Sequence, residues 1–382
     1  MLTASYNDKH RWSQRTYDSR LTTKTMINQS ANDRFEKGRG AQFNPKNRFL
    51  KGAYMQEHVE GIDDWEHEKS ETQYILDASK TLVNTVTSPD VGMMYSANPY
   101  QGCEHGCIYC YARNSHEYWG YSAGIDFESR IVVKKNAPAL LRKFFDNKNW
   151  LPAPISLSGN TDCYQPIERK MRITRSLLEI CLEYRNPVGI LSKNALVLRD
   201  LDIIQELNKL NLVRVFSSIT SLDEDLRRVL EPRTASYRSR LKVVETMAKS
   251  GVPVGIMNAP LIPGLNDMHM HDVLKAASEA GAKWAGYTVV RLNGAIGDIF
   301  KDWLFKAFPD RAPKVWHQIC ECHDGTVNDS RFGNRIVGDG KFAELIKTQF
   351  QLYCRKYHLN ETKMEWNTSA FRRMKNNQLP LF

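Results

Sequence analysis

Three cysteines lie close together in the stretch NPYQGCEHGCIYCYAR, which covers residues 98–113. Their spacing is C-x3-C-x2-C, at Cys103, Cys107 and Cys110. A structural zinc ion takes four protein ligands, so zinc would also need a histidine such as His105 or His116. An iron–sulfur cube held by three thiolates instead leaves one iron open to a further ligand. The spacing therefore favours a [4Fe–4S] cluster, with zinc as the alternative.

The elements that must position this loop follow from the pattern after residue 91, where short β-branched runs alternate with amphipathic segments. The predicted strands cover residues 91–97, 154–158, 187–192, 212–219, 252–258 and 284–290. The predicted helices cover residues 174–184, 200–209, 238–249, 267–280, 298–307, 312–322 and 341–357. Strand–helix alternation implies right-handed crossovers and a parallel sheet. Six such strands suit a partial or full barrel, or an open doubly wound sheet.

Polar or small residues follow almost every predicted strand, as in GNTDCYQPIE after residue 158 and SSITSLDE from residue 217. In a parallel barrel the carboxyl ends of the strands meet at one face and carry the active site. The sequence therefore predicts a polar site at that face.

The overall composition is mildly basic. The 382 residues include 53 Lys and Arg against 43 Asp and Glu, so the formal net charge is +10. This balance favours a polyanionic partner such as DNA, although many enzymes share it. No signal peptide and no membrane-spanning apolar run is evident, so we expect a cytoplasmic protein with reduced thiols and no membrane contact.

The cysteine loop and its flanks carry a family resemblance. The stretch of residues 98–113, followed by HEYWGYSAGIDFE (residues 116–128), resembles the spore photoproduct lyase-like branch of the radical S-adenosylmethionine (SAM) superfamily. It is most similar to a largely uncharacterised bacterial subfamily of that branch. The stretches KGRGA, TDCYQPIE and LEPRTAS, from residues 37, 161 and 230, are similar to the same subfamily.

This resemblance implies an α/β fold, a partial parallel (β/α) barrel of radical SAM type. It also implies a [4Fe–4S] cluster on the three cysteines, with SAM bound at the open iron. One electron from a reductant such as flavodoxin or ferredoxin would split SAM into methionine and a 5′-deoxyadenosyl radical, which abstracts a substrate hydrogen.

The resemblance and the strand ends together suggest cofactor-binding residues. Those expected to bind SAM are Tyr109, Gly159, Asn160, Thr161, Asp162, Ser192, Lys193, Ser218 and Arg291. Three of them have a plainer alternative, because Asp162 and Ser218 are also suited to capping turns and Lys193 to the surface. Cys163 is a candidate catalytic hydrogen donor, with a buried inert thiol as its alternative. Cys320, Cys322 and Cys354 leave a second metal site open.

The chain ends in QLPLF, Gln378 to Phe382, which resembles the short peptide that binds the bacterial sliding clamp. Its apolar residues suit an extended peptide that fills surface pockets. The alternative is a tail that docks on its own domain.

Five regions are predicted. They are a basic polar arm at residues 1–55, an acidic linker and lead-in at 56–90, the barrel at 91–308, a helical extension at 309–370 and a tail at 371–382. The predicted function is a radical SAM enzyme acting on nucleic acid, as in DNA lesion repair. The alternatives are radical modification of RNA or protein, and a non-catalytic, zinc-bound DNA adaptor recruited to the clamp.

Overall fold

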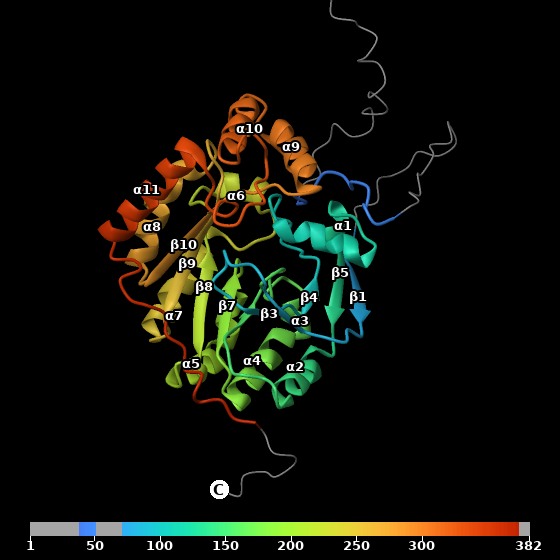
Figure 1. Cartoon of the computed structure of the whole chain (residues 1–382), viewed down its shortest axis with the longest axis vertical. Coiled ribbons are helices and arrows are strands. Elements are labelled where there is room, and N and C mark those ends of the chain that lie inside the picture. Colours follow the sequence, from blue (N-terminus) through green and yellow to red (C-terminus); the bar gives the residue numbers. More distant parts are fainter. Residues whose placement is uncertain (1–37, 51–70, 374–382) are drawn as a thin grey trace, which may run out of the picture. The chain divides into compact units, whose positions relative to one another are not determined.

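The structure is a computed structural model that describes residues 38–50 and 71–373 (Figure 1). The predictions for residues 1–37, for the acidic stretch at 56–70 and for the tail peptide at 378–382 lie outside this range. No helix within the described residues is long and apolar enough to cross a membrane.

The larger sheet has seven strands in the order β10-β9-β8-β7-β6-β3-β2. They are β2 (Val83–Thr85), β3 (Tyr95–Ala97), β6 (Ile155–Leu157), β7 (Val188–Ser192), β8 (Val213–Ser218), β9 (Val254–Leu261) and β10 (Trp284–Val289). From β3 to β10 every pairing is parallel, whereas β2 runs antiparallel to β3. The six predicted strands are therefore confirmed, and their carboxyl ends share one edge of the sheet.

A smaller sheet of three strands lies beside the cysteine loop. It has the order β1-β5-β4, with bounds β1 (Gln73–Asp77), β4 (Tyr100–Gln101) and β5 (Arg130–Lys134). Strands β1 and β5 are parallel, and β4 is antiparallel to β5. Within the described residues the two sheets are not joined into a closed barrel. The fold is thus the expected α/β fold with a partial barrel, and two strands, β1 and β2, lie in the stretch that we predicted as a lead-in.

Helices α1 to α8 come from the segments between the strands of the larger sheet, and α9 to α11 follow its last strand, β10. The α-helices are α1 (Ile125–Ser129), α2 (Ala137–Asp146), α3 (Glu168–Met171), α4 (Ile173–Tyr184), α5 (Leu201–Lys209), α6 (Glu224–Leu230), α7 (Tyr237–Lys249), α8 (Met270–Glu279), α9 (Ile296–Ala307), α10 (Ala312–Glu321) and α11 (Gly340–Lys356). Three 3₁₀ helices are η1 (Tyr111–Trp119), η2 (Ala195–Asp200) and η3 (Asp267–His269). All seven predicted helices are confirmed.

The main core lies between this sheet and its helices. Helix α5 packs on β8, α7 packs on β8 and β9, α8 packs on β9, and α11 covers α8 (Figure 1). Alternate strand residues such as Val188 and Ile190 are buried there with helix residues such as Leu177 and Leu207. Each such side chain stabilises the fold by about 1.5–3 kcal/mol through burial of apolar surface.

Residues 357–373 form a C-terminal strap along the amino ends of the strands. Its bonds to that edge join Asn360 to Lys283, Thr362 to Trp284, Glu365 to Arg214, Asn367 to Asn211 and Arg372 to Tyr184. The last described residues lie near α5, away from α6 and α9 (Figure 1). The predicted helical extension is therefore helical in α10 and α11 and extended afterwards.

Candidate active site

The cysteine loop lies between β4 and η1. Its turns depend on Gly102 and Gly106, whose φ angles are 75° and 67°. A side chain is excluded at both positions, because a Cβ on Gly102 would lie 2.9 Å from the Arg130 carbonyl oxygen and one on Gly106 would lie 2.7 Å from Glu128 Oε2. Residues with a Cβ rarely adopt such φ values, so the two glycines allow the cysteine loop to curve tightly.

The three thiols of this loop share an environment that disfavours thiolates. Cys103 and Cys107 are buried, and burial raises the pKa of all three cysteines. Negative charge on Cys107 and Cys110, together with Asp162, raises the pKa of Cys103 further. The thiols are thus close enough to repel one another when ionised. A cationic iron cluster would supply the charge that three neighbouring thiolates need, so this donor set fits a [4Fe–4S] group.

A single metal ion fits less well. Zinc would need a fourth ligand beside the three cysteines. The histidines proposed for it are engaged elsewhere: His105 Nδ1 lies 3.3 Å from Asp162, and the His116 ring packs on Tyr121 and Phe127. Within residues 38–50 and 71–373, Cys320, Cys322 and Cys354 are not grouped as a second metal site.

A buried ion pair supports the cysteine loop from behind. Arg113 and Glu128 are both fully buried and their side chains lie 2.5 Å apart. Arg113 also donates to the carbonyl oxygens of Gly106 (3.2 Å) and Cys107 (3.0 Å). One side chain therefore holds the loop by two backbone oxygens, and its charge is balanced by a carboxylate.

Residues 39–41 of the predicted arm complete this support. The backbone N–H groups of Gly40 and Ala41 donate to Glu128 at 2.9 and 2.8 Å, and Arg39 donates to the Glu128 carbonyl oxygen at 2.8 Å. A Cβ on Gly40 would lie 1.8 Å from the Gly106 carbonyl oxygen. The RGA triplet thus packs directly on the cysteine loop, and this part of the predicted polar arm is docked on the rest of the protein.

The loop after β6 was predicted to bind SAM through Gly159, Asn160, Thr161 and Asp162. Three of these residues bond to the β3–β4 region or η1: Tyr111 donates to the Gly159 carbonyl (2.7 Å), Asn160 donates to Gln101 (3.0 Å), and Thr161 donates to the Tyr100 carbonyl (2.6 Å). They therefore lie beside the cysteine loop, at the predicted edge of the sheet.

Asp162 is the centre of a network at this edge. Its carboxylate accepts from Ser192 Oγ at 2.9 Å and from the Lys193 backbone N–H at 2.8 Å, and it faces His105 at 3.3 Å. Burial alone would raise the pKa of Asp162, but His105 and these hydrogen bonds lower it. The carboxylate therefore joins the cysteine loop to the ends of β6 and β7.

Lys193 links the same edge to β8 and to the LEPRTAS stretch. Its ammonium donates to Ser218 at 2.5 Å, lies 3.8 Å from Glu231 and lies 5.9 Å from the centre of the Tyr109 ring. The predicted cofactor residues Tyr109, Ser192, Lys193 and Ser218 are therefore brought together.

Glu231 is the acid at the base of this group. It is fully buried, accepts from the Tyr109 hydroxyl and pairs with Arg240 at 2.6 Å. Burial would raise the pKa of Glu231, but Arg240, Lys193 and the hydrogen bonds outweigh it and lower the pKa to about 2. Arg233, two residues further on, does not pair with Glu231 but donates to the Gly38 carbonyl oxygen at 3.0 Å.

Two predicted residues lie apart from this group. Arg291 follows β10 and donates to Asn328 at 2.7 Å, and burial, with nearby Arg335, lowers its pKa. Cys163 has no exposed surface and lies in the main core, where burial raises its pKa well above the ordinary value. This burial favours the inert-thiol alternative for Cys163.

Sequence reasoning missed Arg113, Glu128 and Arg240. Each is a charged residue that is fully buried, which charged side chains rarely are unless they are paired. Their charged partners lie 9 to 89 residues away in sequence, as for Arg240 with Glu231 and Glu128 with Arg39, so spacing alone gave no signal. The quoted family stretches did contain two of them, Arg113 and Glu128.

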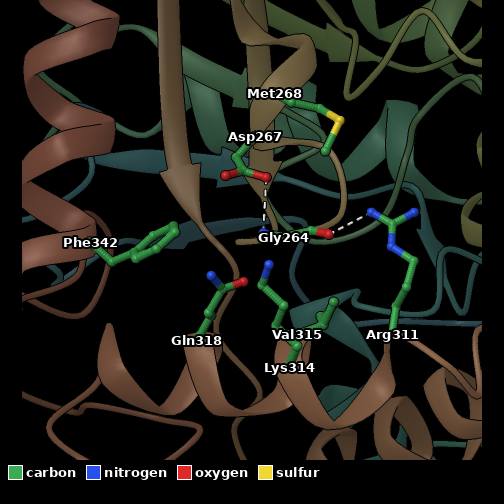
Figure 2. A pocket seen from close by; sticks show the side chains of 8 residues that line it. All are labelled: Gly264, Asp267, Met268, Arg311, Lys314, Val315, Gln318 and Phe342. Atoms are coloured by element: carbon green, nitrogen blue, oxygen red, sulfur yellow. Dashed lines mark hydrogen bonds between the residues drawn. The ribbon is translucent and has the colours of Figure 1, made fainter.

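A separate pocket of about 330 Å³ lies between the loop after β9, α10 and the start of α11 (Figure 2). Arg311 donates to the Gly264 carbonyl there at 2.6 Å, and Asp267 accepts from the Gly264 N–H at 2.9 Å. None of the predicted cofactor residues lines it.

Comparisons with known proteins agree with this geometry. Residues 97–277 match the family model of the radical SAM superfamily. An uncharacterised protein of Methanocaldococcus jannaschii is 31% identical over 199 residues, which is 52% of this chain and 71% of that protein. An uncharacterised protein of Mycobacterium tuberculosis is 33% identical over 218 residues, 56% of this chain. The match spans 64% of the length of the mycobacterial protein.

The fold is similar to that of a solved spore photoproduct lyase, complexed with dinucleoside spore photoproduct. The TM-score is 0.53 at 16% identity, and the similarity covers 78% of this chain and 85% of that chain. A variant of the same lyase, with bound SAM and dinucleoside spore photoproduct, gives a TM-score of 0.52 at 15% identity.

The loop of three thiols at the carboxyl edge of a parallel sheet defines a cluster-binding α/β protein. The chain belongs to the radical SAM superfamily. The cofactors of this family are a [4Fe–4S] cluster and SAM.

Proposed function

We propose that the protein is a radical SAM enzyme that abstracts a hydrogen atom from nucleic acid, with a DNA lesion as its substrate. The observation that carries this proposal is the loop of Cys103, Cys107 and Cys110, held by Arg113 and Glu128 beside the polar edge of the parallel sheet. When bound, the cluster supplies the electron that splits SAM.

The protein's own residues would bind and orient the cofactor. We assign the loop of Gly159, Asn160 and Thr161 to the methionine end of SAM, and Ser192, Lys193 and Ser218 to its polar groups. Asp162 is already engaged by Ser192 and Lys193, so its role is to hold the cluster loop and the strand ends in register. Tyr109, fixed by Glu231, forms one wall of the same site. Arg291 would bind an anionic group at the mouth.

Cys163 remains a weaker proposal as a hydrogen donor. Its thiol has no exposed surface, so a substrate radical would reach it only after the core opened. The proposal for the reaction does not depend on it.

Two observations support nucleic acid as the substrate. The formal net charge is +10, which favours a polyanion. The similar solved lyase is complexed with a dinucleoside, spore photoproduct. We extend this substrate class, and not that lesion, to the present chain.

We propose two protein partners. A reductant such as flavodoxin or ferredoxin would supply the electron. The peptide from Gln378 to Phe382 would bind a bacterial sliding clamp, and residue 373 is held at the amino edge of the sheet by a bond from Arg373 to the Trp150 carbonyl oxygen at 2.8 Å. A partner bound near there would leave the carboxyl edge accessible.

The first experiment measures SAM cleavage. The protein is purified without oxygen, its cluster is rebuilt, and 5′-deoxyadenosine is measured after addition of dithionite, with Cys103→Ala as the control. We expect 5′-deoxyadenosine from the wild type and none from the variant. Zinc in place of iron and sulfide, with no product, would refute the enzyme and leave the zinc-bound adaptor.

The second experiment separates nucleic acid from the RNA and protein alternatives. Ultraviolet-damaged DNA, undamaged DNA, RNA and a mixture of cell proteins are each incubated with the active enzyme and analysed by mass spectrometry. A changed DNA lesion is the expected result. A change in RNA or in a protein would favour the second candidate reaction.

A further inference from the structure

Two exposed aromatic rings pack against each other at η1, the helix that follows the cysteine loop. Phe49 is 51% exposed and Tyr118 is 72% exposed, and their ring centres lie 4.7 Å apart with a tilt of 33°. The Arg48 guanidinium lies 4.8 Å from the centre of the Phe49 ring and 5.9 Å from that of Tyr118. We call Arg48, Phe49 and Tyr118 the aromatic platform.

The platform is fixed before any ligand binds. Arg48 pairs with Glu117 at 3.1 Å, and its backbone N–H donates to the same carboxylate at 3.2 Å. Asn47 donates to the carbonyl oxygens of Glu117 and Tyr121, both at 2.9 Å, and accepts from the Phe49 N–H at 2.9 Å. Exposed aromatic rings gain little from folding, so this rigid support suggests that the rings serve a partner.

A second, independent anchor holds the same segment. Asn44 and Asp126 exchange two hydrogen bonds, at 3.0 and 2.9 Å, and Ser122 donates to the Pro45 carbonyl oxygen at 2.7 Å. The rings therefore keep one position relative to η1, whose first residue follows Cys110 directly.

The helix η1 connects the platform to the candidate active site. Tyr111, at its start, is 58% exposed and donates to the Gly159 carbonyl oxygen at 2.7 Å. Tyr118 is seven residues further on, which is roughly 14 Å along a 3₁₀ helix. This is the length of about four stacked nucleotides.

We propose that the aromatic platform binds single-stranded or flipped-out nucleobases of the substrate by stacking. This inference rests on the proposed function, since it takes nucleic acid as the substrate. The cations next to Phe49 suit phosphate: Lys46 and Arg48 are exposed, whereas the Glu117 carboxylate that pairs with Arg48 is buried. Flat rings interleaved with cations form the surface to which unpaired bases and their backbone bind.

The test is binding of a fluorescent single-stranded oligothymidine to the cluster-loaded protein, followed by anisotropy. Removal of one ring, in Phe49→Ala or Tyr118→Ala, is expected to weaken binding about 5- to 150-fold, the usual loss for a base–aromatic stack. Leu352→Ala is the matched control, because Leu352 on α11 is an apolar residue that is 52% exposed and lies outside the aromatic platform. Thermal unfolding and iron content verify that each variant is folded and loaded.

An abasic oligonucleotide of the same length and charge separates stacking from electrostatics. The wild type should prefer the base-containing strand, and Tyr118→Ala should lose most of that preference. Arg48→Ala should reduce the slope of the logarithm of the binding constant against the logarithm of the salt concentration by about one, the value for one phosphate contact. The ring variants should leave this slope unchanged.

Three outcomes would overturn the platform. Equal binding of the oligothymidine by the wild type and the ring variants would exclude stacking there. If the ring variants lose thermal stability but not binding, the rings stabilise the protein's own fold and do not bind the substrate. If the wild type binds no nucleic acid yet produces 5′-deoxyadenosine, both the platform and the nucleic-acid substrate fail, while the radical chemistry stands.

Discussion

The close contact between Gly40 and the cysteine loop predicts that even a methyl group at residue 40 will disturb the loop. A Cβ on Gly40 would lie 1.8 Å from the Gly106 carbonyl oxygen, and real Cβ atoms essentially never approach within 3.0 Å. In Gly40→Ala the two segments must therefore separate by about 1.2 Å, the difference of these two values. Since Gly40 donates to Glu128 at 2.9 Å, the same movement away would stretch that bond to about 4.1 Å and break it.

The change in the free energy of unfolding follows from the hydrogen bonds that Gly40→Ala would break. Gly40 and Ala41 each donate to a buried carboxylate, and a hydrogen bond to a charged group contributes about 1.5–3 kcal/mol. If both are lost, the protein should be destabilised by about 3–6 kcal/mol, less whatever entropy the released segment regains. Glu128 would then be bonded to Arg113 without the backbone N–H groups of residues 40 and 41. We expect the hydrogen bond from Arg113 to the Cys107 carbonyl oxygen to weaken as a result.

The assay compares Gly40→Ala with Gly92→Ala. Gly92 is the matched control because a Cβ there meets nothing within 4 Å. We expect Gly40→Ala to lower the free energy of unfolding of the cluster-free protein and to retain less iron and sulfide after reconstitution. An iron content and an unfolding free energy equal to those of Gly92→Ala would refute the support that we assign to residues 39–41.

Four further predictions follow from the buried groups and the tail. Burial lowers the pKa of His116 to about 4 from an ordinary 6.5, so stability should fall as the pH drops from about 6.5 to 4; His116→Phe should abolish that loss in denaturant titrations across this range. Cys163→Ala should leave 5′-deoxyadenosine production and substrate conversion intact, and loss of conversion alone would restore its role as a hydrogen donor. Cys320→Ser should leave the iron and zinc contents unchanged in elemental analysis. Removal of residues 374–382 should abolish binding to a purified sliding clamp and leave SAM cleavage unchanged.

The sheet could be predicted because its strands are buried on both faces or nearly so. Runs such as VGILS in β7 are short, β-branched and bounded by Pro187, which is the signature of a parallel strand between helices. Strands β1, β2, β4 and β5 were not predicted. β1 and β2 are largely exposed and β4 has only two residues, so none of them forms an apolar run. In β5 the apolar run is limited to Ile131, Val132 and Val133 between two charged residues.

The cofactor site was predictable in position more than in detail. The spacing of the cysteines and the polar residues after β6, β7 and β8 predicted a site at the carboxyl edge, and the structure brings these residues together there. The sequence around Asp162 gave no sign that its carboxylate would accept hydrogen bonds from Ser192 and Lys193. Those bonds depend on how β6 and β7 align, about 30 residues apart in the chain. Partners so distant in sequence are set by the tertiary fold.

The same limit explains why the docking of residues 38–50 could not be read from their sequence. Its composition, basic and rich in glycine and asparagine, is that of a disordered arm. Its order comes from Glu128, whose buried charge would be costly with Arg113 alone and is completed by the N–H groups of Gly40 and Ala41. The cysteine loop, the ion pair and residues 39–41 are therefore one unit: a change in any of them should first be seen in how firmly the cluster is held.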